Sequence, residues 1–315
     1  MENAGWLLEA LYAYKNKKLN KNILGIDFEN PVGLAAGFDY EGQLAKTMKH
    51  IGFGFNTVGT VTAKPYAGNK PPRLGRLVES QSLLINKGFK SEGAVTVAKI
   101  LDAKKLEGHT IGISVGASNI PSVNTIENMI KDYLFTFTLF KEKSYVKYFE
   151  LNISCPNTTM KEPFSNIINF ENLIKEITKL NIKQPIFVKM PIEISLPDAD
   201  KIVATGLKYS IKGYIFSNLV KDRSNKSFVK SEIDEVKNLK GNFSGKPCFE
   251  GSNKLLKHIR SKFGNKVVLI GLGGIFTPQD AITKFKSGAD LVQLITGMIF
   301  EGPQIAGEIN SELIQ

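Results

Sequence analysis

Residues 267–296 read VVLIGLGGIFTPQDAITKFKSGADLVQLIT, and this stretch decides the fold. It begins with a continuous apolar run that ends in glycines, and it closes with a second apolar run at 291–296. Between the two runs lies a helical pattern over 278–287, which opens at Thr277 and Pro278. Apolar runs without polar alternation are typical of parallel strands that are buried on both faces. A strand, a helix and a second strand in this order predict one βαβ unit.

The same alternation extends over most of the chain. The expected strands are 32–37, 55–61, 110–116, 148–154, 185–191, 213–218, 267–274 and 291–296. The expected helices are 41–51, 92–105, 123–142, 168–180, 198–209, 252–262, 278–287 and 303–313. Eight βα units in a chain of this length predict a (β/α)8 TIM barrel of the α/β class. A doubly wound open sheet is the alternative.

The first residues precede this pattern and form a separate segment. Apolar residues at helical spacing, followed by lysines, predict a helix within residues 4–20. We therefore divide the chain into an N-terminal helical segment, 1–22, and a barrel, 23–315. The helix either packs on the barrel as a cap or lies on a bilayer with its lysines at the headgroups. The apolar residues that would meet the bilayer are Trp6, Leu7, Leu8 and Tyr12.

The composition argues against several classes of protein. The chain has 315 residues and a net charge of +11, with 41 basic and 30 acidic side chains. The lysines are spread along the whole chain instead of gathering with aromatic residues, so we expect a solvated surface and no nucleic-acid partner. Two cysteines and three histidines argue against a disulfide framework and a metal centre, and favour a reducing compartment. No apolar run is long enough to span a membrane and no signal peptide is expected, which predicts a cytoplasmic protein.

Two connections are longer than the few residues that usually join elements of a barrel. They are residues 62–91, after the second expected strand, and residues 219–248, after the sixth. Long connections without secondary structure of their own are commonly functional. In a barrel, the connections that follow strands lie on the active-site face.

Glycines and polar residues gather at the carboxyl ends of the expected strands. Gly273 and Gly274 end one strand, and Thr296 follows Ile295 at the end of the next. Bare backbone N–H groups can point at an anion, and barrels often hold a phosphate in this place. These two neighbouring strand ends therefore predict a phosphate-binding site. The alternative is that the glycines only allow a tight strand-to-helix turn.

Two reactive side chains stand out. Lys189 lies in the apolar strand 185–191, where a buried amine is costly unless it is paired. It either makes an internal salt bridge or faces an electron-rich cofactor or an anion. Cys155 lies between Asn152 and Asn157. It is either a base or nucleophile that reacts as its thiolate, or an inert small side chain.

Eight motifs together resemble one known family. They are NPVGLAAGFD (30–39), IGFGFNTVGTVTAKPYAGNKPPRL (51–74), NISCPNT (152–158), VKMP (188–191), SNLVKDRS (217–224), GNFSGKP (241–247), GLGGI (271–275) and LVQLITGMIFEGP (291–303). In order and spacing they are similar to the motifs of dihydroorotate dehydrogenases. The resemblance implies a TIM barrel that binds FMN and oxidises dihydroorotate to orotate in pyrimidine biosynthesis.

The resemblance also implies roles for individual residues of this chain. Cys155 would be the base that takes a proton from the carbon next to the substrate carbonyl, while a hydride leaves the neighbouring carbon for the flavin. The segment 158–166 would be a flap over the substrate. The implied cofactor-binding residues are Ala35, Ala36, Gly37, Gly59, Thr60, Ser114, Asn152, Lys189, Ser217, Ser244, Gly245, Gly273, Gly274, Ile295 and Thr296. The implied substrate-binding residues are Asn86, Asn152, Asn157, Asn218 and Tyr40.

The chain combines features of two classes within the family. Soluble members use a cysteine base, and membrane-associated members that reduce quinones use a serine base. The SCPN motif around Cys155 resembles the soluble class, whereas AAGFD, GTVTAKP, NKPPRL, DRS and FSGKP resemble the quinone-reducing class. The resemblance therefore implies a quinone as electron acceptor, with fumarate as the alternative. A quinone would favour peripheral contact with the inner face of the membrane, and the oligomeric state stays open.

The positions that meet the substrate carboxylate in the family differ here. Tyr40 and Val58 stand at the two places where family members keep a lysine. Lys87 or Lys90 could supply the missing cation. These departures leave two alternatives to dihydroorotate oxidation open: an FMN enzyme that acts on another ring, and a flavin-binding protein without turnover. The other departures from the family pattern are Ser114 and Leu219.

Overall fold

Eight short strands with almost no exposed residue close into a parallel barrel in the computed structural model, which describes residues 5–315. The order around the barrel is β10-β12-β13-β3-β4-β7-β8-β9, so the alternative of an open sheet is wrong. All eight strands that the sequence predicts are confirmed. Their bounds are β3 (Val32–Leu34), β4 (Phe55–Val61), β7 (Ile111–Val115), β8 (Val146–Asn152), β9 (Ile186–Met190), β10 (Gly213–Phe216), β12 (Val268–Leu272) and β13 (Leu291–Leu294).

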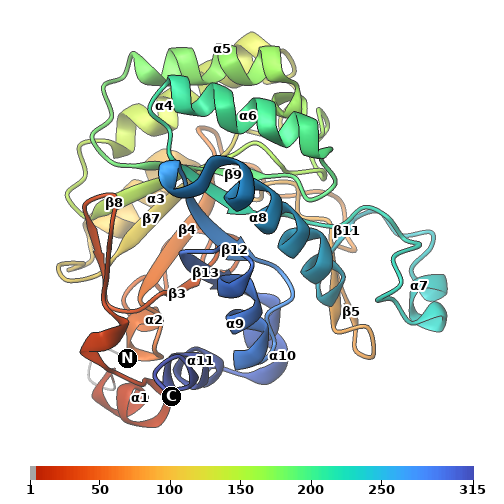
Figure 1. Ribbon diagram of the computed structural model, residues 1–315. Helices are drawn as coiled ribbons and strands as arrows, with labels where there is room; N and C mark the ends of the chain where they lie inside the picture. Colours follow the sequence, from red (N-terminus) through yellow and green to blue (C-terminus); the bar gives the residue numbers. More distant parts are fainter. Residues whose placement is uncertain (1–4) are drawn as a thin grey trace.

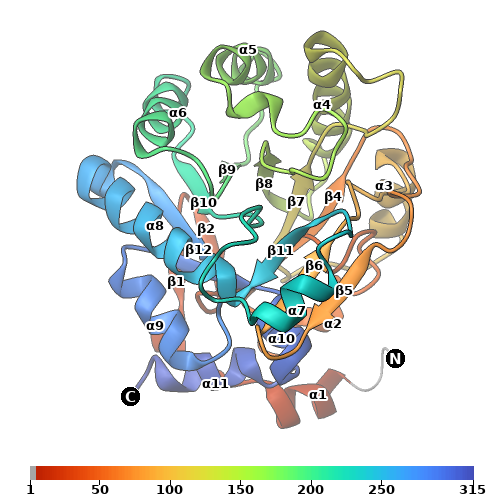
Figure 2. The same ribbon diagram turned by 90° about the vertical axis from the view of Figure 1, so that its right-hand side faces the viewer.

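Helices surround the barrel and cover its outer face (Figures 1 and 2). Their apolar faces pack on the outward side chains of the strands and form the two largest clusters of buried residues. The helices are α2 (Thr47–His50), α3 (Ala94–Asp102), α4 (Ile126–Phe140), α5 (Ile167–Thr178), α6 (Leu196–Lys208), α8 (Phe249–Phe263), α9 (Pro278–Lys286), α10 (Thr296–Glu301) and α11 (Ile305–Glu312). The expected helix over 41–51 is too long, because Asp39 accepts a hydrogen bond from the Leu44 N–H and holds the chain before α2 in turns.

The N-terminal segment contains more than the predicted helix. The expected helix over 4–20 is confirmed only in its first half, and the first four residues of the predicted segment lie outside the described residues. A two-stranded antiparallel hairpin follows, and its first strand spans the boundary that we placed after residue 22. The elements are α1 (Gly5–Tyr12), η2 (Lys17–Leu19), β1 (Lys21–Ile23) and β2 (Ile26–Phe28).

The hairpin closes the end of the barrel opposite the active-site face. Ile26 and Phe28 are buried against side chains that point into the barrel. The rings of Phe28 and Phe55 make an edge contact with centroids 5.1 Å apart. Above this apolar floor lies a polar layer, in which the buried Glu150 carboxylate accepts hydrogen bonds from Thr57 (2.6 Å) and Gln293 (2.7 Å).

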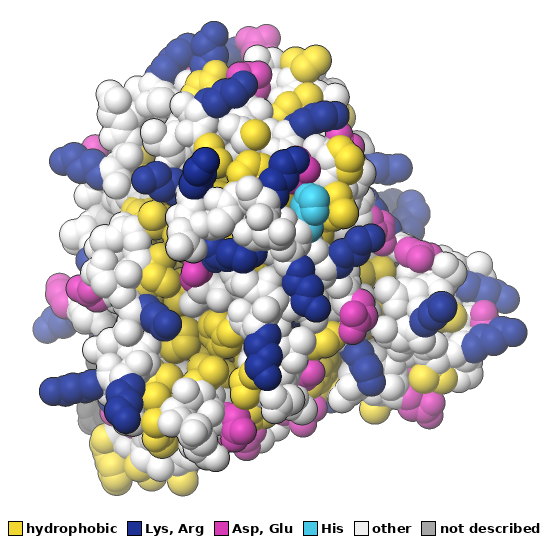
Figure 3. All heavy atoms as spheres, viewed as in Figure 1, with side chains coloured by type: hydrophobic (Ala, Val, Ile, Leu, Met, Phe, Trp, Pro, Cys, Tyr) yellow, Lys and Arg dark blue, Asp and Glu magenta, His cyan; other side chains and the backbone are white. Residues whose placement is uncertain are grey.

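Helix α1 packs on the barrel with one face and exposes the other. Leu8 and Tyr12 contact the core between the barrel and the C-terminal helices, as expected of a helix that packs on the barrel. Trp6, Leu7 and Leu11 are exposed, with Trp6 71% accessible. Figure 3 shows apolar side chains gathered where Figure 1 places α1, whereas lysines and arginines are scattered over the rest of this face. No helix within residues 5–315 is long and apolar enough to cross a membrane.

The two long connections carry secondary structure that the sequence analysis missed. They meet in a three-stranded antiparallel sheet of order β11-β6-β5, which lies in front of the barrel when it is viewed along its axis (Figure 2). The Arg223 guanidinium donates hydrogen bonds to the carbonyls of Val236 (2.9 Å) and Leu239 (2.7 Å) and so fixes the loop around α7. The elements are β5 (Leu74–Leu77), β6 (Ser82–Ile85), α7 (Lys230–Glu235) and β11 (Asn242–Gly245).

Candidate active site

A cavity of about 350 Å³ lies at the carboxyl ends of the barrel strands, between them and the β11-β6-β5 sheet. Strand ends that are far apart in the sequence meet there because the barrel closes. Seventeen of the predicted residues line the cavity: Ala35, Ala36, Gly37, Tyr40, Thr60, Asn152, Cys155, Asn157, Lys189, Ser217, Asn218, Ser244, Gly245, Gly273, Gly274, Ile295 and Thr296. Gly59, Ser114 and Asn86 do not line it.

Ser114 and Gly59 support residues that do line the cavity. The Ser114 hydroxyl lies 2.9 Å from the Thr60 hydroxyl, which also accepts a hydrogen bond from the Asn152 amide (3.0 Å). The Gly59 carbonyl accepts the Gly37 N–H (2.7 Å). A Cβ on Gly59 would stand 2.8 Å from the Ser114 carbonyl oxygen. Ser114 and Gly59 therefore position Thr60 and Gly37, and their direct contacts with a cofactor stay a prediction.

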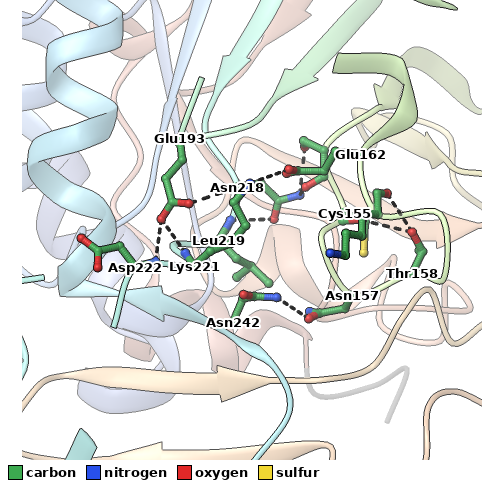
Figure 4. Close-up of polar contacts among 12 residues, drawn as sticks. Cys155, Asn157, Thr158, Glu162, Glu193, Asn218, Leu219, Lys221, Asp222 and Asn242 are labelled. Carbon is green, nitrogen blue, oxygen red and sulfur yellow. Dashed lines mark hydrogen bonds and ion pairs between the residues drawn. The ribbon is translucent and has the colours of Figure 1, made fainter. Parts of the chain in front are cut away.

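Asn86 belongs to a network of amides behind the cavity wall. The Asn69 amide donates to the Asn86 side chain and to the Asn157 carbonyl, both at 2.8 Å. The Asn157 amide donates to the Ile85 carbonyl (2.9 Å) and its oxygen accepts from Asn242 (2.6 Å), as Figure 4 shows for the second bond. These bonds join the loop after β8 to β6 and β11, so the small sheet fixes the position of Asn157.

Lys189 is the most deeply buried cation in the cavity wall. Only 5% of it is accessible, and it forms no hydrogen bond or ion pair with any residue of the range 5–315. The internal salt bridge that we considered is therefore absent. Burial lowers the pKa of Lys189, and the nearby Glu150 carboxylate opposes that shift. Ser217 also lines the cavity, and its buried hydroxyl has no partner among the described residues. Both groups are left to bind something within the cavity.

Cys155 follows β8 and lines the cavity. No group of three His, Cys, Asp or Glu residues able to hold a metal occurs among residues 5–315. Burial raises the pKa of the Cys155 thiol to about 12, and the Glu162 carboxylate adds to this rise. The Asn157 backbone N–H and the Lys189 ammonium act in the opposite direction. At neutral pH the thiol is therefore protonated, and only a small fraction is thiolate.

Gly273 and Gly274 form a tight turn after β12. Their φ values are +104° and +75°, which favour glycine. A Cβ on Gly273 would lie 2.7 Å from the Cβ of Cys248, and one on Gly274 would lie 2.6 Å from the Cβ of Phe249. Neither N–H donates to another described residue. The turn that we considered as the alternative is thus present, and it also leaves two donors available for an anion.

The segment 158–166 begins next to Cys155 and is tied to the loop after β10. Glu162 forms an ion pair with Lys221 (2.6 Å), as Figure 4 shows. Glu193 accepts the backbone N–H groups of Lys221 (2.6 Å) and Asp222 (2.8 Å). The segment ends in the short helix η3 (Pro163–Ser165). These contacts hold the predicted flap against the neighbouring loop.

The sequence analysis missed most of the apolar wall. Leu83 and Ile85 of β6 lie outside every motif, and Leu74 and Ile299 lie within motifs that gave them no role, because an apolar side chain has no chemical signature. Of the two positions where a carboxylate-binding lysine was expected, only Tyr40 lines the cavity, whereas Val58 packs in the core against the helices. The unpredicted lining residues are Phe38, Leu74, Leu83, Ile85, Gly88, Phe89, Cys248, Leu272, Ile275, Leu294, Gly297 and Ile299.

Comparisons with known proteins place this chain in a family. A family profile described as "Dihydroorotate dehydrogenase" matches residues 18–315. The "Dihydroorotate dehydrogenase (quinone)" of Christiangramia forsetii is 34% identical, over 98% of this chain and 88% of that protein. The protein of the same name from Brucella anthropi is 33% identical, over 92% of this chain and 79% of its own length. Among solved structures, DHODH from Eimeria tenella in complex with ferulenol is similar with a TM-score of 0.84 and 26% identity, over 99% of this chain and 89% of that chain. The chain belongs to the dihydroorotate dehydrogenase family.

Proposed function

We propose that this chain binds FMN, oxidises dihydroorotate to orotate in pyrimidine biosynthesis, and passes the electrons to a quinone. The observation that carries the proposal is that Cys155 and Lys189 line one cavity, and that Asn152, Asn157 and Asn218 line it with them. A pyrimidine ring presents alternating carbonyl and N–H groups. Asparagine amides can both donate to and accept from such a ring.

The residues at the β9, β12 and β13 end of the cavity fit FMN. The free N–H groups of Gly273 and Gly274 suit its phosphate. Thr296 donates to the Ser244 hydroxyl (2.8 Å), which ties the β11 turn to the same place. The unpaired ammonium of Lys189 suits the electron-rich isoalloxazine ring. When bound, FMN supplies the acceptor for a hydride that leaves the substrate carbon next to the one that loses a proton.

The chain's own part in the reaction is to remove that proton and to hold the ring. Cys155 accepts the proton from the carbon beside the substrate carbonyl, which requires its thiolate. The positive charge of Lys189 favours this thiolate, since it lowers the pKa of Cys155 against the effect of burial. The ion pair between Glu162 and Lys221 holds the segment 158–166 against the loop after β10, and a flap in this place would limit the access of water to the base.

A quinone as acceptor is supported by the relatives named dihydroorotate dehydrogenase (quinone) and by the apolar part of the cavity wall. Leu74 and Ile299 line the cavity and are also partly exposed, at 54% and 38%. The exposed face of α1 would bring the protein to the inner face of the membrane, where quinones dissolve. Fumarate is a small dianion, and an apolar wall offers it no charged or hydrogen-bonding partner.

The test is steady-state turnover by the purified protein. A visible flavin spectrum and formation of orotate from dihydroorotate with a short-chain quinone are the expected results. Orotate formation with fumarate but not with quinone would overturn the acceptor while leaving the dehydrogenase reaction intact. A flavin spectrum without orotate formation in either case would favour a flavin enzyme that acts on another ring, or a flavin-binding protein without turnover.

A further inference from the structure

The cavity holds a second lysine that forms no ion pair with a described residue. Lys87, in the connection between β6 and α3, lines the cavity. Its Nζ lies 4.6 Å from the centre of the Tyr40 ring and makes no hydrogen bond or ion pair with residues 5–315. A half-buried ammonium that contacts only an aromatic face retains most of its capacity to bind an anion.

Lys90, three residues further on, is a natural point of comparison. It forms ion pairs with Glu41 (3.3 Å) and Glu92 (3.5 Å), and its Nζ lies 6.0 Å from the centre of the Tyr40 ring. It does not line the cavity. Of the two lysines in this segment, only Lys87 is both unpaired and directed at the site.

The backbone around Lys87 is fixed, so its direction is a property of the fold. The Asn86 N–H donates to the Arg73 carbonyl (2.9 Å), and the Lys87 carbonyl accepts the Asn69 N–H (3.2 Å). Gly88 then turns the chain with a φ of +64°. These bonds leave the Lys87 side chain as the part of the segment that can extend over Tyr40.

Tyr40 itself cannot supply the positive charge. Burial raises the pKa of the Tyr40 phenol, and the nearby Cys155 adds to this rise, so the group is neutral at any physiological pH. Tyr40, Lys87 and Cys155 line the same cavity. In dihydroorotate, the carbon that carries the carboxylate is the neighbour of the carbon that loses its proton. A cation for the carboxylate must therefore lie close to Cys155.

We propose that Lys87 binds the carboxylate of the substrate, and that the Tyr40 ring positions its ammonium. This inference rests on the proposed function, because it needs a substrate with a carboxylate beside the reacting carbon. Burial and the neighbouring Lys90 and Arg73 lower the pKa of Lys87, while Glu41 opposes them. A carboxylate placed against this ammonium would relieve the repulsion between the cations and form a charge-assisted hydrogen bond.

The test compares Lys87→Met with Lys90→Met, which removes an equal charge from the same segment. Binding of orotate and of uracil, which lacks the carboxylate, is measured through the change in the flavin spectrum of the holoprotein. We expect Lys87→Met to weaken orotate binding at least tenfold and to leave uracil binding within twofold. Lys90→Met should change neither by more than about twofold. In turnover, the KM for dihydroorotate should rise more than kcat falls in Lys87→Met, and Lys87→Arg should recover most of the loss.

Three outcomes separate this inference from the function on which it rests. Wild-type protein that holds flavin but binds neither orotate nor dihydroorotate would contradict the function itself. Tight orotate binding that is unchanged in Lys87→Met would overturn only the role of Lys87. If Lys87→Met loses its flavin through misfolding, Lys87→Gln removes the charge with less change in polarity and decides in the same way. Because Lys87 already supplies the cation, Tyr40→Lys should not improve catalytic efficiency, and a tenfold improvement would also contradict the assignment.

Discussion

The two ends of the cavity differ in the elements that form them: one is formed by barrel strands and their ends, and the other by loops. The end near β9, β12 and β13 is backbone and buried strand residues, with Gly273, Gly274 and Lys189 held by the barrel itself. The other end is made of side chains on connections, where Cys155 and Lys87 extend from loops that a small sheet and several amides hold in place. A substitution in a barrel strand disturbs the core, whereas one in a loop does not.

The largest effect on turnover should come from a substitution at the loop end of the cavity, and it should leave FMN binding at the barrel end unchanged. Cys155→Ala removes the proposed base and should lower kcat by about 10²–10⁴-fold, while the FMN content stays equal to that of the wild type. Cys155→Ser should keep part of the activity, because the serine alkoxide can accept the proton, although it is rarer than the thiolate since a hydroxyl is a much weaker acid. Turnover numbers and the flavin-to-protein ratio are the measurements. Wild-type turnover in Cys155→Ala would exclude Cys155 as the base.

The second prediction concerns pH. Because burial raises the pKa of Cys155 to about 12, the reactive thiolate is the minor form at neutral pH and its fraction rises with pH. The rate of the proton-removal step should therefore increase about tenfold per pH unit from pH 7 to 9, roughly a hundredfold in total. Flavin reduction by dihydroorotate under single-turnover conditions gives this rate. A plateau below pH 8 would show that the bound substrate leaves the thiol far more acidic than its burial implies.

The third prediction moves to the barrel end. Lys189→Ala removes the only cation that β9 places in the cavity wall and should weaken FMN binding or slow flavin reduction at least tenfold, about 1.4 kcal/mol. Lys189→Met, which keeps the apolar stem without the charge, separates the loss of the ammonium from a packing defect. The measurements are FMN retention on dilution and the rate of flavin reduction. Full flavin content together with normal reduction in both variants would be incompatible with a cofactor role.

The smallest expected effect concerns the proposed phosphate site at Gly273 and Gly274, and Gly264, another glycine with a positive φ, serves as the control. Gly274→Ala should lower FMN affinity several-fold, because its Cβ would meet Phe249 and the positive φ strains any other residue. Gly264→Ala carries a similar strain at a φ of +56° but points into open space, far from the cavity wall. Both variants should lose stability in denaturant titrations, Gly274→Ala more than Gly264→Ala because its Cβ also meets Phe249, and only Gly274→Ala should release FMN more readily. Equal FMN affinity in the two variants would remove Gly274 from the cofactor site.

The same contrast between barrel and loops decides how much of the fold could be predicted. The apolar runs predicted every barrel strand because burial on both faces leaves a pattern in the sequence itself. The strands β1 and β11 were missed, since Lys21–Ile23 is largely exposed and Asn242–Gly245 contains two polar residues and a glycine. β11 exists because it pairs with β6, more than 150 positions earlier in the chain. Local sequence does not carry such pairings.

The site follows the same rule. Residues at strand ends, such as Gly273 and Lys189, could be placed before the structure was seen, because the barrel sends every strand end to one face. From the sequence alone, Lys87 and Lys90 were equally good candidates for the cation that meets the substrate carboxylate. Their difference depends on where Glu41 and Glu92 lie and on the turn at Gly88, which arise from tertiary contacts of the loop.

Anaerobic titration of the purified holoprotein with dihydroorotate tests the central claim most directly, since it requires both ends of the cavity to work together and needs no external acceptor. We expect one equivalent of dihydroorotate per flavin to bleach the visible spectrum and to yield an equal amount of orotate. Cys155→Ala, with the same flavin content, should bleach at least a hundred times more slowly. A wild-type protein that keeps its oxidised flavin spectrum in excess dihydroorotate would contradict the account.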